Sequence, residues 1–195
     1  MPGADPGPDQ ARLHGVLVDV YGIGILLQGP SGTGKSECAL DLVVRGHRLV
    51  ADDLIVVSRD VAAGIVIGQG PEEIRHHMEI RGLGVINIRD LFGIAAIRTR
   101  KRIELVVVLE PWTPEGEYDR LGVDDQTTEL LDVRLPLLRL PVSAGRNMAI
   151  LVEVAARNHL LKLMGHHAAR EFADRLDRQL ERPPSFPAVS EEDTE

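Results

Sequence analysis

The chain has little cysteine, no long apolar run and no excess of positive charge. Cys38 is the single cysteine among 195 residues, so no disulfide can form within the chain. No apolar stretch reaches the roughly 20 residues that a membrane-spanning helix requires. Lysine and arginine together number 22 against 30 aspartates and glutamates, for a formal net charge of −8. This balance disfavours nonspecific binding to nucleic acid or to an anionic membrane, and we expect neither as a partner.

The amino end also lacks the charged and apolar regions of a secretory signal, which favours a cytoplasmic protein. Hydrophobic residues make up 44% and charged residues 27%, an ordinary composition for one globular domain of this length. Residues 1–11 are rich in proline, glycine and aspartate, and residues 183–195 are proline-broken and acidic. We expect both ends to be disordered tails around one domain over residues 12–182.

Hydrophobic patterns between the tails predict an α/β fold. The stretch GVLVDVYGIGILLQG indicates two strands joined by a tight turn at residues 22–24, and the second strand leads into a glycine-rich loop. A helix is expected from Lys35 to Arg45, with Gly46 as its stop. Further strands are predicted over residues 47–58, 64–68 and 104–110, and two helices over residues 146–165 and 166–182. The expected fold class is α/β, a P-loop nucleotide-binding core with a mixed sheet and a carboxy-terminal helical pair.

The loop GPSGTGKS matches the phosphate-binding pattern G-x-x-x-x-G-K-S, and it lies between a predicted strand and a predicted helix. Its glycines allow successive backbone N–H groups to converge on phosphate oxygens at the positive end of the helix. The lysine can neutralise the phosphates, and the serine hydroxyl can ligate Mg²⁺. The expected nucleotide-binding residues are Gly29, Pro30, Ser31, Gly32, Thr33, Gly34, Lys35 and Ser36.

An enzyme with such a loop also needs a carboxylate near the metal or the attacking group, and two candidates compete. Glu110 ends the most apolar predicted strand, and this position slightly favours it. Asp52 and Asp53 interrupt another apolar run, which costs desolvation energy unless a metal, a cation or a reacting proton requires them. An ordinary solvated turn would explain the pair equally well. The residues alone leave the choice open.

Several segments, in order, resemble the catalytic domain of the HPr kinase/phosphorylase family. They are HGVLVDVYGIGILLQGPSGTGKSECALDLVVRGHRLVADD, MEIRGLGVINIRDLFG, EYDRLG, LPVSAGRNMAILVEVAARN and MGHHAAREFADRL, between His14 and about Leu176. The resemblance implies an enzyme that uses ATP to phosphorylate a serine of HPr, a small phosphocarrier of the sugar phosphotransferase system. It also implies the reverse reaction, in which inorganic phosphate removes the phosphoryl group and pyrophosphate is released. An HPr-type partner and a homohexamer are expected on the same ground.

The resemblance also assigns catalytic roles to individual residues. Asp53, rather than Glu110, would accept the serine proton during phosphorylation and return it during dephosphorylation. His14 would help to hold the charge and geometry of the acid pair. Arg120 would stabilise charge on the transferring phosphoryl group. The predicted catalytic set is His14, Lys35, Asp53 and Arg120.

Two further segments gain a role from the resemblance. Residues 79–88, EIRGLGVINI, would be needed for both reactions, and Glu79 would join Ser36 as a Mg²⁺ ligand beside ATP or pyrophosphate. The family commonly carries Arg-Pro where this chain has Ser143 and Ala144, so weaker phosphorolysis is expected. The segment tied mainly to dephosphorylation comprises Pro141, Val142, Ser143, Ala144, Gly145 and Arg146.

The histidine pairs and the basic run of the sequence are assigned to no functional site. The pairs at residues 76–77 and 166–167 are histidines, but adjacent residues of a strand or helix point apart and no cysteine accompanies them. The basic run RTRKR, residues 98–102, is interpreted as an exposed turn rather than a phosphate patch. Two other functions remain as alternatives. They are a kinase for a different small molecule or protein, and a noncatalytic module that senses ATP, which would need no base for a hydroxyl acceptor.

Overall fold

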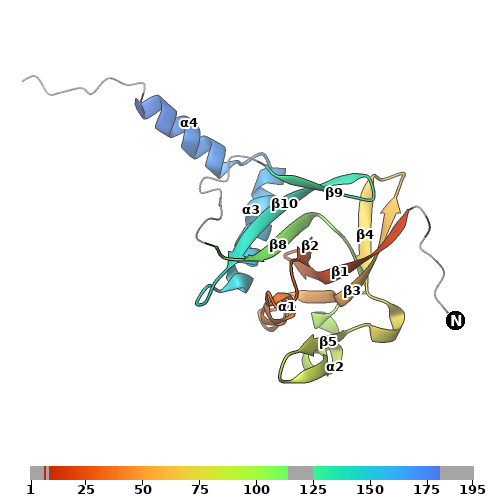
Figure 1. Cartoon of the computed structure of the whole chain (residues 1–195). Helices are drawn as coiled ribbons and strands as arrows, with labels where there is room; N and C mark the ends of the chain where they lie inside the picture. Colours follow the sequence, from red (N-terminus) through yellow and green to blue (C-terminus); the bar gives the residue numbers. More distant parts are fainter. Residues whose placement is uncertain (1–6, 8, 114–124, 181–195) are drawn as a thin grey trace, which may run out of the picture.

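The computed structural model describes residues 7, 9–113 and 125–180 (Figure 1). Its strands are β1 (Gln10–Val20), β2 (Ile23–Gln28), β3 (Arg48–Asp60), β4 (Ile65–Gln69), β5 (His77–Ile80), β6 (Gly84–Asn87), β7 (Arg100–Arg102), β8 (Leu105–Pro111), β9 (Thr127–Leu130) and β10 (Val133–Val142). An eight-stranded mixed sheet runs in the order β7-β4-β3-β1-β2-β8-β10-β9. β5 and β6 form a separate two-stranded sheet.

The α-helices of the described residues are α1 (Lys35–Val44), α2 (Ile88–Phe92), α3 (Met148–Leu163) and α4 (Ala168–Leu180), with 3-10 turns η1 (Glu72–Ile74) and η2 (Ile94–Ala96). The predicted α/β class, with a mixed sheet and two carboxy-terminal helices, is confirmed. Gly165, with a φ angle of 89°, separates α3 from α4 as expected. α4 extends away from the sheet (Figure 1). Within the described part of the chain, every helix is too short or too polar to cross a membrane.

The parallel part of the sheet brings two predicted functional segments to one edge. β2 runs parallel to β8, and β8 runs parallel to β10, while the other neighbours in this sheet pair antiparallel. β2 ends at Gln28, directly before the glycine-rich loop, and β10 ends at Val142. The carboxyl ends of neighbouring parallel strands are the usual ligand side of an α/β sheet. Residues 29–36 and 141–146 therefore share that side.

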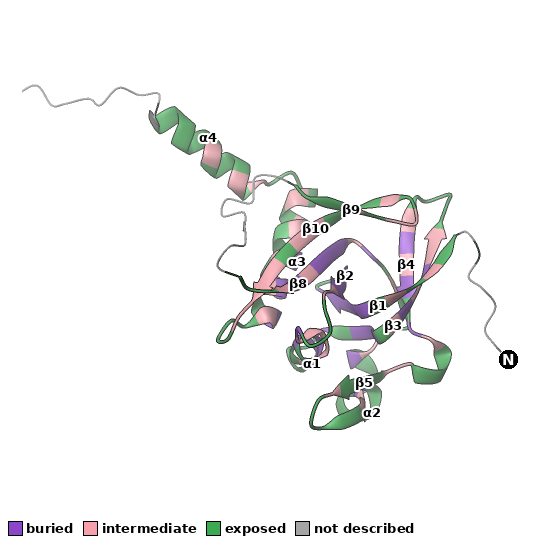
Figure 2. Ribbon diagram, viewed as in Figure 1, coloured by how far each residue is buried: buried purple, intermediate pink, exposed green. Residues whose placement is uncertain are grey.

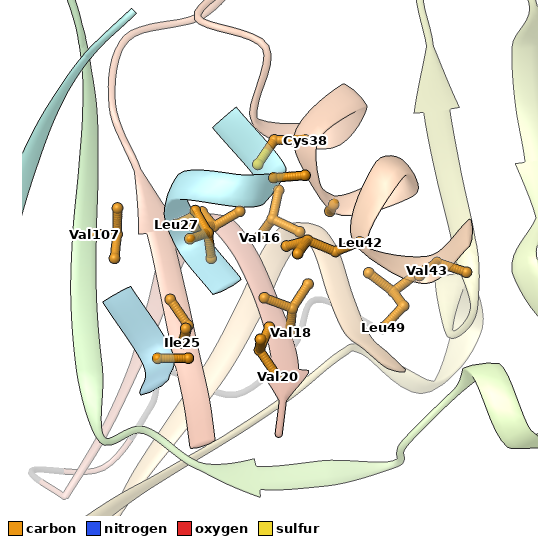
Figure 3. Packing of buried hydrophobic residues seen from close by; sticks show 14 of the residues in the cluster. Val16, Val18, Val20, Ile25, Leu27, Cys38, Leu42, Val43, Leu49 and Val107 are labelled. Carbon is orange, nitrogen blue, oxygen red and sulfur yellow. The ribbon is translucent and has the colours of Figure 1, made fainter. Parts of the chain in front are cut away.

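Apolar side chains cover both faces of the sheet, and Figure 2 shows the buried stretches of β1, β2 and β8 in purple. Successive residues of a strand point to opposite faces, so Val16 and Val18 join one cluster and Leu17 the other. The first cluster packs against α1 and α3, with Leu42 and Ala156 fully buried (Figure 3). α1 is thereby fixed against the strands that flank the phosphate loop.

The turn between β1 and β2 differs from its predicted position. Tyr21 and Gly22 form it, with φ angles of 53° and 85°. Gly24 lies inside β2 instead, where a methyl group would come within 1.8 Å of the carbonyl oxygen of Arg102. This glycine permits the close approach of the last residue of β7 rather than a turn.

Other boundaries also differ from the sequence prediction. β1 begins at Gln10, so it takes in the last two residues of the predicted tail, because these residues pair with β3. β3 runs without interruption through Asp52 and Asp53. The basic run at residues 98–102 is not simply an exposed turn, since its last three residues form β7 at the edge of the sheet. The predicted tail at residues 183–195 lies outside the described residues.

Candidate active site

The glycine-rich loop lies between β2 and α1, as its pattern predicts. Gly29, Gly32 and Gly34 have positive φ angles of 138°, 83° and 81°, which other residues rarely adopt. A methyl group on Gly29 would also lie 2.0 Å from the carbonyl oxygen of Leu109. The first loop position therefore accepts only glycine, because the loop passes directly against β8. Its backbone leads into the amino end of α1, where the helix dipole favours a phosphate group.

Lys35 folds over this loop. Its Nζ donates hydrogen bonds of 2.9 Å to the carbonyl oxygens of Gly29 and Pro30. The hydroxyl of Thr33 donates to the same Pro30 oxygen at 2.9 Å. Pro30 and Ser31 face solvent, so the loop is open on its outer side. The lysine ammonium is held where it can reach phosphate oxygens that the loop binds.

The carboxylate of Asp52 joins the loop to the small β5–β6 sheet. Its Oδ1 accepts a 2.8 Å hydrogen bond from the Ser36 hydroxyl, and its Oδ2 accepts one of 3.3 Å from the backbone N–H of Glu79. Asp52 is only 6% exposed. Burial raises the pKa of Asp52 above its ordinary value, while the two hydrogen bonds act in the opposite direction. A buried carboxylate of this kind favours a cation close by.

Asp53, the next residue, is instead 81% exposed. Its φ angle of 63° is unusual for a residue other than glycine, and strained backbone of this kind gathers at functional sites. The Nδ1 atom of His14, on β1, lies 3.6 Å from the Asp53 Oδ1. The strand register aligns Val16 with both Leu27 and Asp52, which sets the acid pair level with the end of β2. The structure thus brings His14, Asp53 and the loop to one end of the sheet.

Glu110, the other acid that the sequence left open, has a different partner. It lies near the end of β8, and Arg139 of β10 contacts its carboxylate at 3.3 Å. Ser36 bonds to Asp52 rather than to this glutamate. The acid pair is therefore the carboxylate group that the fold attaches to the phosphate loop.

The predicted Mg²⁺ ligands, Ser36 and Glu79, lie on either side of Asp52. Hydroxyl and carboxylate oxygens are the donors that Mg²⁺ prefers, and the ion usually completes its shell with water and substrate phosphates. Among the described residues, no group of three His, Cys, Asp or Glu side chains is placed to hold a metal. The donor set fits a Mg²⁺ ion that arrives with a phosphate chain, rather than an ion in a cage of protein ligands.

Arg81 lies in the predicted segment at residues 79–88, but the sequence analysis assigned it no role of its own. It follows β5 in the turn that leads to β6, and a methyl group on Gly32 would lie 3.3 Å from its guanidinium. It is exposed, and no acid among the described residues pairs with it. Guanidinium groups bind phosphate oxygens strongly. The available signal was a basic residue two positions after Glu79 in a glycine-rich turn, but its approach to the loop depends on the tertiary fold.

Arg120 and its EYDRLG motif lie outside the described residues. The predicted dephosphorylation segment is described. Its first two residues, 141–142, end β10, and the chain then turns so that the N–H of Arg146 donates to the Ser143 carbonyl at 3.2 Å. The Arg146 guanidinium donates to the Pro141 carbonyl at 2.7 Å. Both hydrogen bonds stay within residues 141–146. The turn that they close lies on the carboxyl side of the parallel strands.

A strand, a glycine-rich loop and a helix, with a carboxylate bonded to the loop serine, define the class of this protein as an α/β P-loop nucleotide-binding domain. The family model "HPr Serine kinase C-terminal domain" matches residues 8–176, and the chain belongs to this family.

Individual relatives agree with that assignment. The chain is 59% identical over 173 residues to the HPr kinase/phosphorylase of Geobacter sulfurreducens, covering 89% of this chain and 54% of that protein. It is 56% identical over 169 residues to the HPr kinase/phosphorylase of Geobacillus kaustophilus, covering 87% and 54%. The chain thus spans about half the length of the curated relatives it matches. The solved structure of the Hpr(Ser) kinase/phosphatase from Coxiella burnetii is 30% identical, with a TM-score of 0.71, and the match covers 79% of this chain and 99% of that one.

Proposed function

We propose that this protein transfers the γ-phosphoryl group of ATP to a serine of an HPr-type phosphocarrier, and that it also catalyses the reverse phosphorolysis. The observation that carries the proposal is the 2.8 Å bond from Ser36 to Asp52 beside the phosphate loop, with the exposed Asp53 adjacent in the chain. Membership of the HPr serine kinase family and the names of the relatives support the choice of substrate.

In the forward direction, the loop holds the triphosphate and aligns it for the incoming serine hydroxyl. The hydroxyl oxygen forms a bond to the γ-phosphorus while the bond from that phosphorus to the bridging oxygen breaks, and ADP leaves with the electron pair. Asp53 accepts the hydroxyl proton, and its exposure allows a protein substrate to reach it. His14, 3.6 Å away, orients the carboxylate. Mg²⁺ bound through Ser36 and Glu79 would offset the charge of the phosphates.

In the reverse direction, the same loop holds inorganic phosphate. A phosphate oxygen bonds to the phosphorus of the phosphoserine, the serine oxygen–phosphorus bond breaks, and Asp53 returns its proton to the serine oxygen. The second product is pyrophosphate, which by the same path can replace ATP as the forward donor. Arg120 belongs to this proposal as a group that stabilises charge on the transferring phosphoryl group.

A cytoplasmic location and a homohexameric assembly complete the proposal. The resemblance to the HPr kinase/phosphorylase family supports both. Light scattering of the purified chain, coupled to size exclusion, measures the assembly directly, and a monomer at micromolar concentration would contradict that part.

The proposed activity is tested with labelled ATP, Mg²⁺ and a panel of HPr-type carriers, each with a matched variant whose acceptor serine is alanine. We expect label on the native carriers alone. A second assay supplies phosphoserine carrier and inorganic phosphate, and measures pyrophosphate. Binding of ATP without transfer to any carrier would contradict the proposal and favour a noncatalytic sensor. Transfer to another acceptor would favour a kinase of different specificity.

A further inference from the structure

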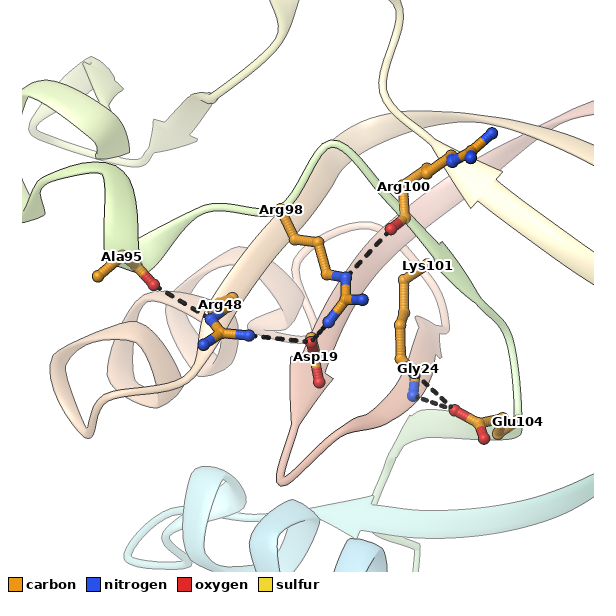
Figure 4. Close-up of polar contacts among 8 residues, drawn as sticks. All are labelled: Asp19, Gly24, Arg48, Ala95, Arg98, Arg100, Lys101 and Glu104. Atoms are coloured by element: carbon orange, nitrogen blue, oxygen red, sulfur yellow. Dashed lines mark hydrogen bonds and ion pairs between the residues drawn. The ribbon is translucent and has the colours of Figure 1, made fainter.

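The basic run at residues 98–102 contributes to a cluster of arginines. The cluster lies near the carboxyl end of α1, away from the phosphate loop. Arg98 donates to the Asp19 Oδ2 at 2.6 Å, and Arg48 lies 3.8 Å from the same oxygen (Figure 4). Asp19 is the last residue but one of β1 and is only 3% exposed. Two guanidinium groups thus converge on one buried carboxylate. The basic run is part of a folded arrangement, although nothing in the proposed reaction uses it.

A hollow of about 250 Å³ opens beside these groups. It is bordered by Asp19, by the turn at Tyr21 and Gly22, and by residues 45–48, where α1 ends and β3 begins. Gly22 and Gly46 have φ angles of 85° and 94°, and a methyl group on either would meet no atom within 4 Å. The rim of the hollow is therefore open at both glycines.

Positive charge predominates around this hollow. Four arginines lie in or beside it against three acids, a local balance of 4 − 3 = +1 in a chain whose formal charge is −8. The arginines are Arg45, Arg48, Arg98 and Arg157, and the acids are Asp19, Asp41 and Glu153. A concave surface with a local excess of cations concentrates small anions from solution.

Two of these arginines retain donors for a ligand. Arg48 uses its Nε on the carbonyl oxygen of Ala95 at 3.3 Å and turns its Nη1 toward Asp19, so its Nη2 has no partner among the described residues. Arg45 uses one nitrogen, Nη2, on Glu153 at 2.7 Å. Their side chains are 50% and 37% exposed. Each guanidinium is anchored by an acid and still presents N–H groups to solvent.

We propose that this hollow binds a small phosphomonoester, whose phosphate group contacts Arg45 and Arg48 and whose organic part lies against Tyr21. Arginine forks match the geometry of phosphate oxygens, and anchoring by Glu153 and Asp19 lowers the entropy lost when they bind. The volume of about 250 Å³ is below the usual range for drug-sized ligands, which favours a molecule of few atoms over a peptide.

The site is separate from the phosphate loop. α1 has 10 residues, so its two ends lie roughly 15 Å apart at about 1.5 Å per residue. The loop is at the first end, and Arg45 follows the second. None of the residues that border the hollow belongs to the proposed catalytic or nucleotide-binding set, so the proposal does not depend on the proposed function.

The test is a titration of the protein with glycerol 3-phosphate, followed by the amide NMR signals of Gly22 and Gly46. We expect both signals to shift together and to saturate with one dissociation constant, in the native chain and equally in Lys35→Ala. Arg48→Gln should weaken binding at least tenfold, while Arg48→Lys, which keeps the charge but lacks the guanidinium fork, should weaken it by a smaller factor. The matched control is Arg134→Gln, an exposed arginine of β10 outside the cluster, which should bind as the native chain does.

Three results would overturn the proposal. The first is an unchanged dissociation constant in Arg48→Gln with a native spectrum elsewhere. The second is a set of shifts confined to the glycines of the phosphate loop. The third is tighter binding of an acidic peptide than of glycerol 3-phosphate, which would make this surface a protein-docking surface instead. If Arg48→Gln loses its folded spectrum, Arg48→Lys decides, because native affinity in a folded Arg48→Lys would contradict recognition by the guanidinium fork.

Discussion

Lys35 is the residue on which both directions of the proposed reaction depend, because ATP, pyrophosphate and inorganic phosphate would occupy the same loop. Its Nζ is already held at 2.9 Å from the loop carbonyls of Gly29 and Pro30. We expect Lys35→Ala to abolish HPr phosphorylation and pyrophosphate release, with little change in thermal stability, since the ammonium contacts only the loop. Activity assays and circular-dichroism melting measure the two effects. Near-normal activity in the folded variant would refute the P-loop assignment.

Asp53 is expected to act as the base, and the amide of Asp53→Asn keeps its shape without its basicity. We expect carrier phosphorylation to fall by at least about a hundredfold, while ATP affinity is retained. Radiolabel transfer and equilibrium binding of ATP measure the two quantities. Glu110→Gln is the matched control, because Glu110 pairs with Arg139 instead of the loop serine. A severe loss in the control with a nearly silent Asp53→Asn would mean that the wrong acid was chosen.

The sequence predicts the phosphate loop well, because the positions of its glycines, lysine and serine depend on one local turn. The choice between the pair Asp52–Asp53 and Glu110 could not be made from pattern, because it depends on the pairing of β1 with both β2 and β3. The same holds for Arg81, which reaches Gly32 only because the β5–β6 hairpin folds back toward the loop. Local motifs can be recognised in a sequence, whereas contacts between distant segments depend on how the strands pair.

Among the elements, those with strong apolar patterns were predictable. β8 is a nearly continuous apolar run, and α1 and α3 have helical spacing that matches the faces they bury. β5, β6 and β9 are only 4 residues each and partly exposed, so they give little periodic signal. β7 consists of three basic residues that tertiary pairing with β4 makes into a strand. Short edge elements follow the sheet they join rather than their own propensity.

Glu153 links α3 to the segment between α1 and β3. It accepts hydrogen bonds from Arg45 at 2.7 Å and from His47 at 2.9 Å. The bond from Arg45 is the main cause that lowers the pKa of Glu153 to about 2 from 4.5. The unfolded chain then binds more protons in acid, so this contribution is present above pH 4.5 and is lost as the pH falls toward 2. It should be worth about 1.5–3 kcal/mol at neutral pH, as for hydrogen bonds to charged groups.

We therefore expect Glu153→Gln to lower the free energy of unfolding at pH 7 by that amount and to flatten its dependence on pH below 4.5. Urea unfolding at a series of pH values measures both. Glu171→Gln on α4 is the control, because Glu171 is 52% exposed and its contact with Arg175 is 3.6 Å, so a change near zero is expected. Equal pH profiles for the native chain and Glu153→Gln would contradict the assigned role.

On the scale of the whole molecule, one edge of the sheet would serve both directions of the proposed reaction. β2, β8 and β10 end on the same side, which places the phosphate loop and the turn at residues 143–146 near one another in the fold. The two directions differ in the charges they must bring together. Phosphorolysis brings inorganic phosphate, a dianion near neutral pH, up to a phosphoserine with roughly two negative charges, so it depends more on nearby cations than phosphorylation does.

Ser143 supplies no cation at a position where the family commonly carries arginine, while the retained Arg146 is held to the Pro141 carbonyl at 2.7 Å. A charged hydrogen bond to phosphate is worth about 1.5–3 kcal/mol where it is desolvated, and less at a half-exposed position such as this one. We therefore expect a balance shifted toward the kinase direction, and roughly tenfold faster phosphorolysis or tighter apparent phosphate binding in Ser143→Arg, with little change in kinase rate. Phosphorolysis of phosphoserine carrier across a phosphate titration measures this, with Ser143→Gln as an uncharged control of similar reach. Unchanged rate and phosphate affinity in Ser143→Arg would show that another cation already serves the entering phosphate.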